Sequence, residues 1–277
     1  MKEFTDSDYS DFLKNNNYIE LFGKKFSLEK PVVKELEPNE FKPEITTVFS
    51  FKDRGVWATH YLNASYRGNF APEIVRNMLL RYTNENDLIL DPMCGSGTSL
   101  IESKLLNRNA VGVDINPKAI VLTKNRLDFE CETISKIKTY LGNSNNLDLI
   151  KDESIDFIIA HPPYANIISY SEEEGDLSKL TVKRFIEEID VVAKEFNRVL
   201  KQDHYCAVLI GDTRKSKHQV PLAYMLMQKF LDNGFVLKED IIKVQWNCQM
   251  TGYWQSRSIK ENFYLIMHEH LFVFRKN

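Results

Sequence analysis

The segment from Leu88 to Thr98 constrains the fold more strongly than any other part of the sequence. Its first three residues, Leu-Ile-Leu, form an apolar run typical of a short buried strand, which ends at Asp91. The sequence Pro-Met-Cys-Gly-Ser-Gly-Thr follows, and a helical pattern begins at Ser99. Because glycine has no Cβ, a Gly-x-Gly turn lets backbone N–H groups approach a ligand closely. This order of strand, turn and helix predicts an α/β domain that holds a nucleoside cofactor.

Strand-like and helix-like segments alternate along the rest of the chain. Apolar periodicity predicts strands at residues 88–91, 110–114, 155–160, 205–210, 236–244 and 270–275, and helices at 71–82, 99–106, 117–129, 182–200 and 221–233. Alternation of this kind predicts a mostly parallel sheet with helices on both faces and an antiparallel terminal strand. In such a sheet, ligands bind at the carboxyl ends of the strands.

The length of the chain, 277 residues, suits one large domain. Residues 1–45 are polar and irregular, with prolines at 31, 38 and 43, and we expect an N-terminal arm or cap there. The catalytic domain is expected over residues 46–277. The net charge of −3 argues against a protein that coats nucleic acid through bulk charge, so any such contact requires a local basic surface.

The four cysteines are scattered and include no C-x-x-C pair, which disfavours a zinc site and a disulfide framework. We expect no metal, and a structural role for His268 and His270 at the start of the last strand. The first residues lack an apolar signal core, and no stretch approaches the length needed to span a bilayer. These features predict a soluble, cytoplasmic protein without membrane contact.

A second motif, His161-Pro162-Pro163-Tyr164, directly follows the strand at 155–160. Beside a nucleoside cofactor, this motif suits a target amino group on a base. Such an exocyclic amino group is a poor nucleophile because its lone pair is delocalised into the base. Hydrogen-bond acceptors aimed at its protons localise that lone pair. A carbonyl of the rigid Pro-Pro step can be one acceptor, and a neutral His161 can be the other. Tyr164 offers an aromatic face on which an extruded base can stack. A simple strand-ending turn is the alternative interpretation.

A second acid, Asp114, ends the strand at 110–114, where a carboxylate can accept hydrogen bonds from both ribose hydroxyls. The glycine spacing is not G-x-G-x-x-G, and Thr98 stands where a phosphate loop would continue toward lysine. Dinucleotide and nucleoside triphosphate sites are therefore disfavoured. A tight turn with a helix-capping Asp is the structural alternative.

Together these residues resemble the S-adenosylmethionine-dependent amino-methyltransferases that modify adenine N6 and cytosine N4 in DNA, over about residues 46–277. The resemblance implies a Rossmann-like class I methyltransferase fold, and His161 to Tyr164 match the family's catalytic D/N/S-P-P-Y/F motif. It also implies a set of cofactor-binding residues: Asp91, Met93, Gly95, Gly97 and Thr98 in the loop, Asp114 at the ribose and Asn143 near the adenine. Met93 replaces the usual Phe, and His161 replaces the usual Asp, Asn or Ser.

The same resemblance implies a site-specific DNA methyltransferase with S-adenosylmethionine as cofactor and double-stranded DNA as partner. Restriction-modification or epigenetic marking, with a cognate restriction endonuclease or a second methyltransferase, is the implied setting. The non-carboxylate at His161 favours cytosine N4 over adenine N6, and the absence of Cys from the motif disfavours cytosine C5. An RNA or protein-amide methyltransferase of the same fold is one alternative. A noncatalytic nucleic-acid-binding subunit is another, against which the intact glycines and Asp114 argue.

Basic residues interleaved with aromatic residues suggest where nucleic acid makes contact. They are Arg54, Arg67, Arg214–His218 and Gln255–Lys260, with Trp246, Tyr253 and Trp254 beside the last of these. We expect these stretches in loops, where they suit phosphate contact and wedging between base steps, although solvated loops are the alternative. Residues 165–180, which include three consecutive glutamates, are expected to form an acidic mobile loop beside the target pocket.

Overall fold

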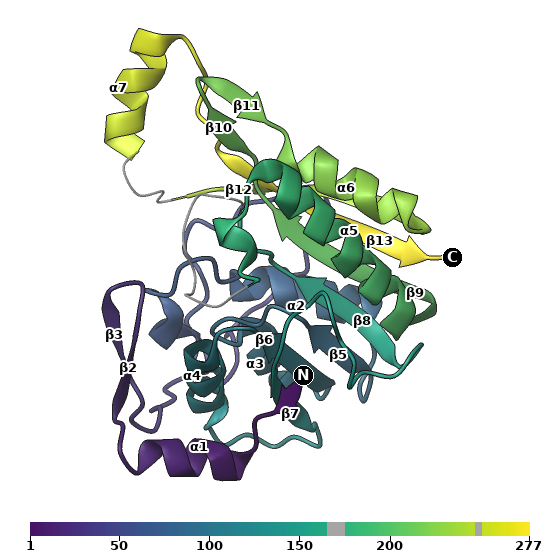
Figure 1. Ribbon diagram of the computed structural model, residues 1–277. Helices are drawn as coiled ribbons and strands as arrows, with labels where there is room; N and C mark the ends of the chain where they lie inside the picture. Colours follow the sequence, from purple (N-terminus) through teal and green to yellow (C-terminus); the bar gives the residue numbers. More distant parts are fainter. Residues whose placement is uncertain (165–174, 247–250) are drawn as a thin grey trace.

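The computed structural model describes residues 1–164, 175–246 and 251–277, so residues 165–174, most of the expected acidic loop, lie outside the described residues (Figure 1). Within the described residues, nine strands form one sheet in the order β1-β7-β6-β5-β8-β9-β13-β12-β4. These strands are β1 (Lys2–Glu3), β4 (Val48–Phe49), β5 (Leu88–Asp91), β6 (Asn109–Asp114), β7 (Ile137–Leu141), β8 (Ile155–Ala160), β9 (Leu200–Ile210), β12 (Phe235–Val244) and β13 (His268–Lys276).

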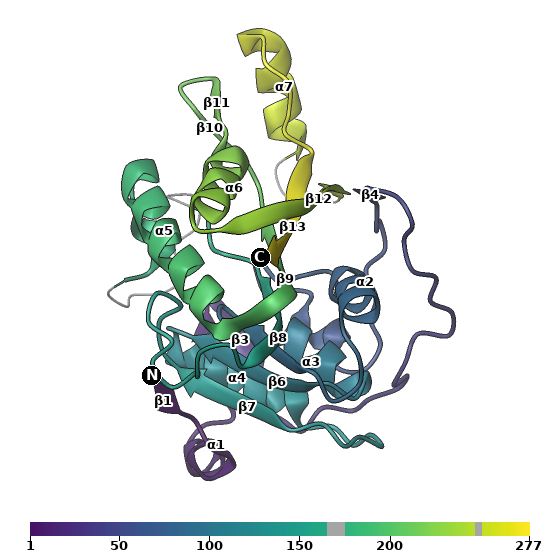
Figure 2. The same cartoon turned by 90° about the vertical axis from the view of Figure 1, so that its right-hand side faces the viewer.

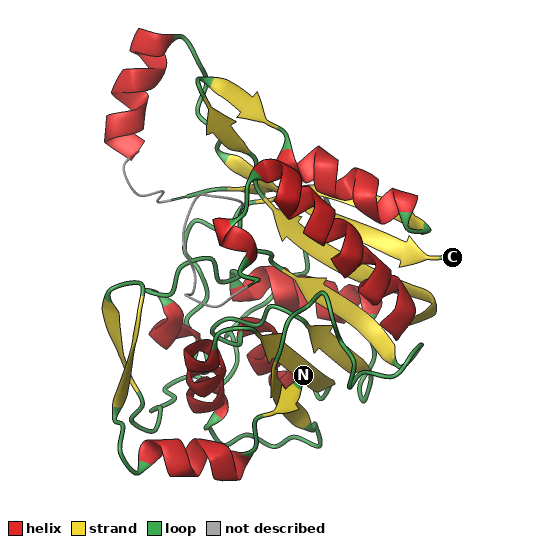
Figure 3. Ribbon diagram, in the orientation of Figure 1, coloured by secondary structure: helices red, strands yellow, loops and turns green. Residues whose placement is uncertain are grey.

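The sheet has helices on both faces, and the described residues form seven α-helices in all (Figures 2 and 3). They are α1 (Asp6–Leu13), α2 (Pro72–Tyr82), α3 (Thr98–Leu105), α4 (Pro117–Leu127), α5 (Val182–Val199), α6 (Leu222–Asp232) and α7 (Thr251–Glu261), with short 3-10 turns η1 (His60–Asn63) and η2 (Leu177–Lys179). Buried side chains of α5 and α6 pack on one face, and those of α2 and α3 pack on the other. The expected α/β architecture is thereby confirmed.

The central strands β7, β6, β5, β8 and β9 are parallel, whereas β13 pairs antiparallel with both β9 and β12. The predicted antiparallel terminal strand is thus confirmed. In β8, Phe157 and Ile159 join the core on one face, and Ile158 and Ala160 join the core on the other. A strand buried on both faces reads in sequence as a continuous apolar run, which is why this strand could be predicted.

Residues 1–45 are more ordered than their polar composition indicated. Strand β1 pairs antiparallel with β7, and β2 (Tyr18–Leu21) forms a hairpin with β3 (Lys24–Ser27). Buried side chains of this hairpin and of α1 cluster with Val121 and Leu122 of α4. Residues 1–27 are therefore packed on the domain, because Ile19, Leu21 and Phe26 of the hairpin are buried in this cluster, whereas residues 28–45 contain no helix or strand and are irregular as expected. A boundary at residue 45 stays a prediction.

The two basic stretches expected in loops are in regular structure. Arg214–His218 spans the antiparallel hairpin of β10 (Thr213–Lys215) and β11 (His218–Val220), and Gln255–Lys260 lies in α7. The expectation of loops was wrong because the hairpin turn at Ser216 and Lys217 has positive φ at both residues without the usual Asn or Gly. In both ribbon views this hairpin and α7, which we call the distal projection, stand away from the sheet (Figures 1 and 2).

Among the described residues, no helix has the length and apolarity that a membrane span requires.

Candidate active site

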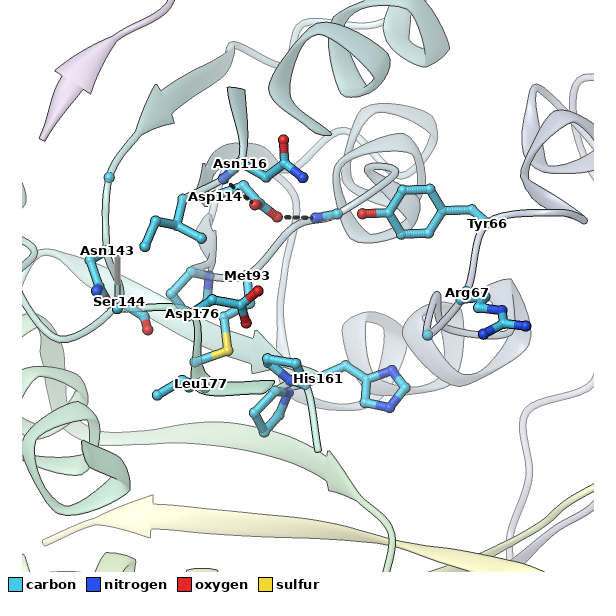
Figure 4. A pocket seen from close by; sticks show the side chains of 18 residues that line it. Tyr66, Arg67, Met93, Asp114, Asn116, Asn143, Ser144, His161, Asp176 and Leu177 are labelled. Carbon is cyan, nitrogen blue, oxygen red and sulfur yellow. Dashed lines mark hydrogen bonds between the residues drawn. The ribbon is translucent and has the colours of Figure 1, made fainter. Parts of the chain in front are cut away.

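A pocket lies at the carboxyl edge of the parallel strands, where the loops after β5, β6, β7 and β8 meet (Figure 4). Residues 66–68 and 175–177 complete its wall. Seven of the residues predicted from the sequence line it: Met93, Gly95, Asp114, Asn143, His161, Pro162 and Pro163. Among the described residues, Asp91, Gly97, Thr98 and Tyr164 are not part of this wall. The sheet thus brings the two motifs together on one cavity.

Asp91 does not line the pocket but holds the cofactor loop in place through hydrogen bonds. Its buried carboxylate accepts hydrogen bonds from the backbone N–H of Met93, at 3.0 Å, and from the hydroxyl of Ser99. Burial raises the pKa of Asp91 to about 7, although these two hydrogen bonds act in the opposite direction. The acid therefore fastens the end of β5 to the first turn of α3.

The glycines of the loop have different roles. Gly95 lies on the pocket wall at φ +55°, and a Cβ there would meet the ring of Tyr66 at 3.1 Å. Gly97 caps α3 at φ +80°, where a Cβ would lie 2.9 Å from the Cγ2 of Thr123. Because φ is positive at both positions, a side chain at either one would strain the backbone. Thr98 follows as a buried residue at the start of α3.

Asp114 ends β6 and presents its carboxylate to the pocket (Figure 4). Oδ2 accepts a hydrogen bond from the N–H of Gly95 at 2.9 Å, and Oδ1 accepts one from the N–H of Asn116 at 2.8 Å. Burial raises the pKa of Asp114 to about 6 and nearby Asp176 adds to the rise, although the two N–H groups lower it. Each oxygen keeps a second lone pair, so the carboxylate can still accept bonds from a pair of hydroxyls.

Several pocket residues were not anticipated from the sequence. Tyr66, Asn116 and Asp176 line the wall together with Asp114 and Asn143. Asn116 follows Asp114 by two positions and caps α4, so the strand end could have suggested it. No local pattern marks Tyr66. Asp176 was not singled out, but it belongs to the segment 165–180 that was expected beside the target pocket.

His161 follows β8 and lies between this pocket and a second one. The second pocket has a volume of about 610 Å³ and shares Tyr66, Arg67, Gly68 and His161 with the first. The Nε2 atom of His161 lies 3.0 Å from the Oη of Tyr164. Its Nδ1 atom is buried and, among the described residues, has no hydrogen-bond partner.

The surroundings of His161 keep its ring neutral. Burial is the largest influence and lowers the pKa of His161 to about 4, and the cations Lys243 and Arg54 act in the same direction. Glu269 and the carbonyl of Gly68 act in the opposite direction without offsetting burial. The ring is therefore uncharged at neutral pH.

Tyr164 contacts residues of β13 and of the turn after β9, and its stacking on a target base stays a prediction. Its hydroxyl donates a hydrogen bond to Glu269, and its ring packs so close to Gly211 that a Cβ there would lie 3.2 Å from Cε2. Tyr164 is absent from the described residues that line either pocket. This hydrogen bond holds the Tyr164 ring against β13. Its acceptor, Glu269, belongs to no sequence motif and is an additional residue of the site.

No group of three or more His, Cys, Asp or Glu side chains in the described part of the chain is arranged to hold a metal ion. The chemistry of the first pocket instead suits a nucleoside, with a carboxylate at Asp114, an amide at Asn143 and a glycine cradle at Gly95. A cofactor with a ribose and a planar base fits these groups.

Comparisons with known proteins agree with this geometry. The fold matches that of an S-adenosylmethionine-dependent methyltransferase from Methanosarcina mazei, with a TM-score of 0.50 and 17% identity over 72% of this chain and 96% of that one. The model of the N6 and N4 methyltransferase family described as DNA methylase matches residues 6–125 and 155–277. The chain therefore belongs to the DNA methylase family, and S-adenosylmethionine is accordingly the cofactor.

Individual relatives match parts of the chain. Type II methyltransferase M.BsoBI of Geobacillus stearothermophilus is 26% identical over 66% of this chain, and M.HpaI of Haemophilus parainfluenzae is 34% identical over 34% of it. A tRNA (guanine(10)-N2)-dimethyltransferase of Methanothermobacter thermautotrophicus is 33% identical over 40% of the chain. These alignments cover 41%, 32% and 32% of the relatives' own lengths, respectively.

Proposed function

We propose that this chain transfers a methyl group to the exocyclic amino group of a base flipped out of duplex DNA. The observation that carries the proposal is the position of His161, which lies on the walls of two adjoining pockets. The first suits the cofactor, and we assign the second to the target base. In this arrangement the base amino group faces the methyl donor across the His161-Pro162-Pro163 segment.

S-adenosylmethionine supplies the electrophilic methyl group when it is bound. The chain's own residues hold the reacting groups in place and direct the lone pair of the amine. Asp114 accepts hydrogen bonds from the ribose hydroxyls, and Asn143 contacts the adenine. The neutral ring of His161 and a carbonyl of the Pro162-Pro163 step would accept hydrogen bonds from the two amino N–H groups, which localises the lone pair toward the methyl group. The nitrogen–methyl bond would form as the sulfur–methyl bond of the donor breaks, and the nitrogen would then lose one proton to solvent.

Cytosine N4 is our preferred target over adenine N6, because the first position of the catalytic motif is not a carboxylate. A structured RNA is the second candidate substrate, since one relative is named for dimethylation of a guanine amino group in tRNA. We propose a restriction-modification setting on the basis of the Type II relatives.

Nucleoside mass spectrometry tests the substrate directly. Plasmid DNA from cells that express the protein should contain N4-methylcytosine, and DNA from cells that express His161→Ala should not. N6-methyladenine in its place would correct the target base within the same function. If the purified protein transfers radiolabel from the methyl donor to RNA or protein but never to DNA, the proposal of a DNA substrate is wrong.

The distal projection is our proposed DNA-contacting surface. It carries five basic residues, Arg214, Lys215, Lys217, Arg257 and Lys260, against one acid, Glu261. Arg214 donates a hydrogen bond to the carbonyl of Tyr264 at 2.8 Å, which ties the hairpin to the segment after α7. Tyr253 and Trp254 are 50% and 43% exposed, so aromatic faces stand beside the cations. Cations and exposed rings together suit phosphate contact and wedging between bases.

The double variant Lys215→Ala/Lys260→Ala should bind duplex DNA more weakly than the wild type, and its affinity should depend less on salt. Each phosphate contact contributes about 0.9 to the slope of log affinity against log salt, so the slope should fall by about 2. Fluorescence anisotropy over a salt series measures this change. The control Lys14→Ala/Lys30→Ala removes the same charge from outside the projection and should keep the wild-type slope; equal slopes for all three proteins would exclude this surface.

A further inference from the structure

We propose that Glu269 is a positioning residue that acts through Tyr164 to hold His161 in the tautomer protonated on Nε2, which leaves Nδ1 as the acceptor for the target amino group. The proposal rests on the function proposed above and adds to it the atom that accepts the hydrogen bond from the amino group. Four groups form one chain of contacts, from Lys243 through Glu269 and Tyr164 to His161.

The first step of the argument is the charge of Glu269. This residue lies on β13 and is buried, and its Oε2 accepts a hydrogen bond from the ammonium group of Lys243 at 2.6 Å. Burial by itself would raise the pKa of Glu269, but the positive charge of Lys243, together with hydrogen bonds from Lys243 and Tyr164, lowers it. Glu269 is therefore an ionised carboxylate and only accepts hydrogen bonds.

The second step follows the single proton of the Tyr164 hydroxyl. Because the carboxylate of Glu269 has no proton to give, Tyr164 must donate its own proton to Oε1. The Oη atom then has only lone pairs to offer to the Nε2 of His161, which lies 3.0 Å away. A hydrogen bond at this distance requires that His161 carries its proton on Nε2.

The third step concerns the other ring nitrogen. A neutral imidazole carries one proton, so protonation of Nε2 leaves Nδ1 with a free lone pair. This atom is buried and has no hydrogen-bond partner within the described residues, although His161 lines both pockets. The backbone of Gly68 raises the pKa of His161, so its carbonyl is the group that would compete as acceptor for the ring proton. An amino group in the second pocket would supply the missing partner.

The packing around the chain of contacts supports a fixed geometry. Gly211 follows β9, and a Cβ there would lie 3.2 Å from the Tyr164 ring and 3.3 Å from the Cγ of Glu269. Such contacts are tighter than ordinary van der Waals packing. The missing side chain at Gly211 therefore lets Tyr164 and Glu269 meet directly behind His161.

The experiment compares Tyr164→Phe with the wild type, because this variant keeps the ring and removes only the hydroxyl. In ¹⁵N spectra at pH 7, wild-type His161 should show the Nε2-protonated tautomer, with its signals assigned by their loss in His161→Asn. Tyr164→Phe should show a mixture of tautomers, and its single-turnover rate should fall by about 10- to 100-fold, by analogy with outer partners that orient a metal-binding histidine. Affinity for S-adenosylmethionine should be unchanged.

A double-mutant cycle separates positioning from a general structural effect. In the His161→Asn background, Tyr164→Phe should cause no further loss of rate, because no tautomer remains to be fixed. Glu269→Gln, which removes the charge at nearly constant volume, should reproduce the tautomer mixture of Tyr164→Phe.

The outcomes distinguish this proposal from the proposed function. A wild-type His161 protonated on Nδ1, or a Tyr164→Phe variant with unchanged tautomer and rate, would overturn the role of Glu269. The spectra need neither cofactor nor nucleic acid, so an Nε2-protonated His161 in a protein that never methylates DNA would support the contact chain and reject only the DNA substrate.

Discussion

Replacement of His161 by alanine should lower the single-turnover rate of methyl transfer by about 100-fold or more between about pH 5 and 8, because the reacting amino group loses a hydrogen-bond acceptor in a buried site. Rapid-quench measurements with saturating cofactor and DNA isolate this chemical step from binding. The circular dichroism spectrum and melting temperature of the variant should match those of the wild type. A His161→Ala enzyme with the wild-type rate would exclude His161 from the chemistry.

The pH dependence of the rate adds a second readout at the same residue. Burial lowers the pKa of His161 to about 4, so the ring stays neutral as the pH falls from 8 to about 5. Below that range the ring gains a proton, the acceptor becomes a donor, and the wild-type rate should fall. His161→Asn cannot titrate and should lose this acidic limb while it retains part of the activity. A shared acidic limb in both proteins would contradict the assigned role.

Replacement of Asp114 by alanine should weaken S-adenosylmethionine binding by about 1–3 kcal/mol, which corresponds to roughly 5- to 150-fold in affinity. The carboxylate lies on the wall of the first pocket and is the acceptor we assign to the ribose hydroxyls. Isothermal titration calorimetry measures the change. Asp128→Ala removes an exposed acid after α4 and is the matched control, since it should keep the wild-type affinity.

The affinity for the cofactor should also depend on pH. The pKa of Asp114 in the free protein is about 6, well above the ordinary value for Asp, because of burial. As the pH falls through 6 the carboxylate gains a proton and loses acceptor capacity, so binding should weaken, whereas at pH 8 it should be at its strongest. Asp114→Asn should bind weakly at both values with little pH dependence. Wild-type affinity in a folded Asp114→Ala protein would reject the assignment.

The sequence could predict those parts of the fold and site that depend on short segments. The strand that ends at Asp91, its glycine turn and the start of α3 are encoded in consecutive residues, and so is the apolar strand before His161. Parallel pairing of β5 with β6 and with β8 then brings Asp114 and His161 to the same edge. For these residues, local pattern and one topological rule were sufficient.

Other residues could not be predicted because long-range packing places them. Glu269 reaches Tyr164 only because β13 lies between β9 and β12 in the sheet, and no sequence motif predicts that strand order. Asp176 comes to Asp114 from a segment sixty-two positions further along the chain. Strand β7 (Ile137–Leu141) also escaped prediction, since Lys138 and Thr139 interrupt the apolar pattern.

The connection between β12 and β13 has a consequence for where the chain tolerates change. Helix α7 lies wholly within this connection and stands clear of the sheet, whereas the two strands that it joins pair along most of their length (Figure 2). The entropic cost of closing a loop grows only with the logarithm of its length. Replacement or lengthening of this connection should therefore lower the free energy of unfolding only slightly. Glu269 stays anchored in the ladder throughout. Replacement of α7 by a segment of different sequence should therefore leave the sheet and the position of Glu269 unchanged, which makes this connection a practical place to test the proposed DNA contact.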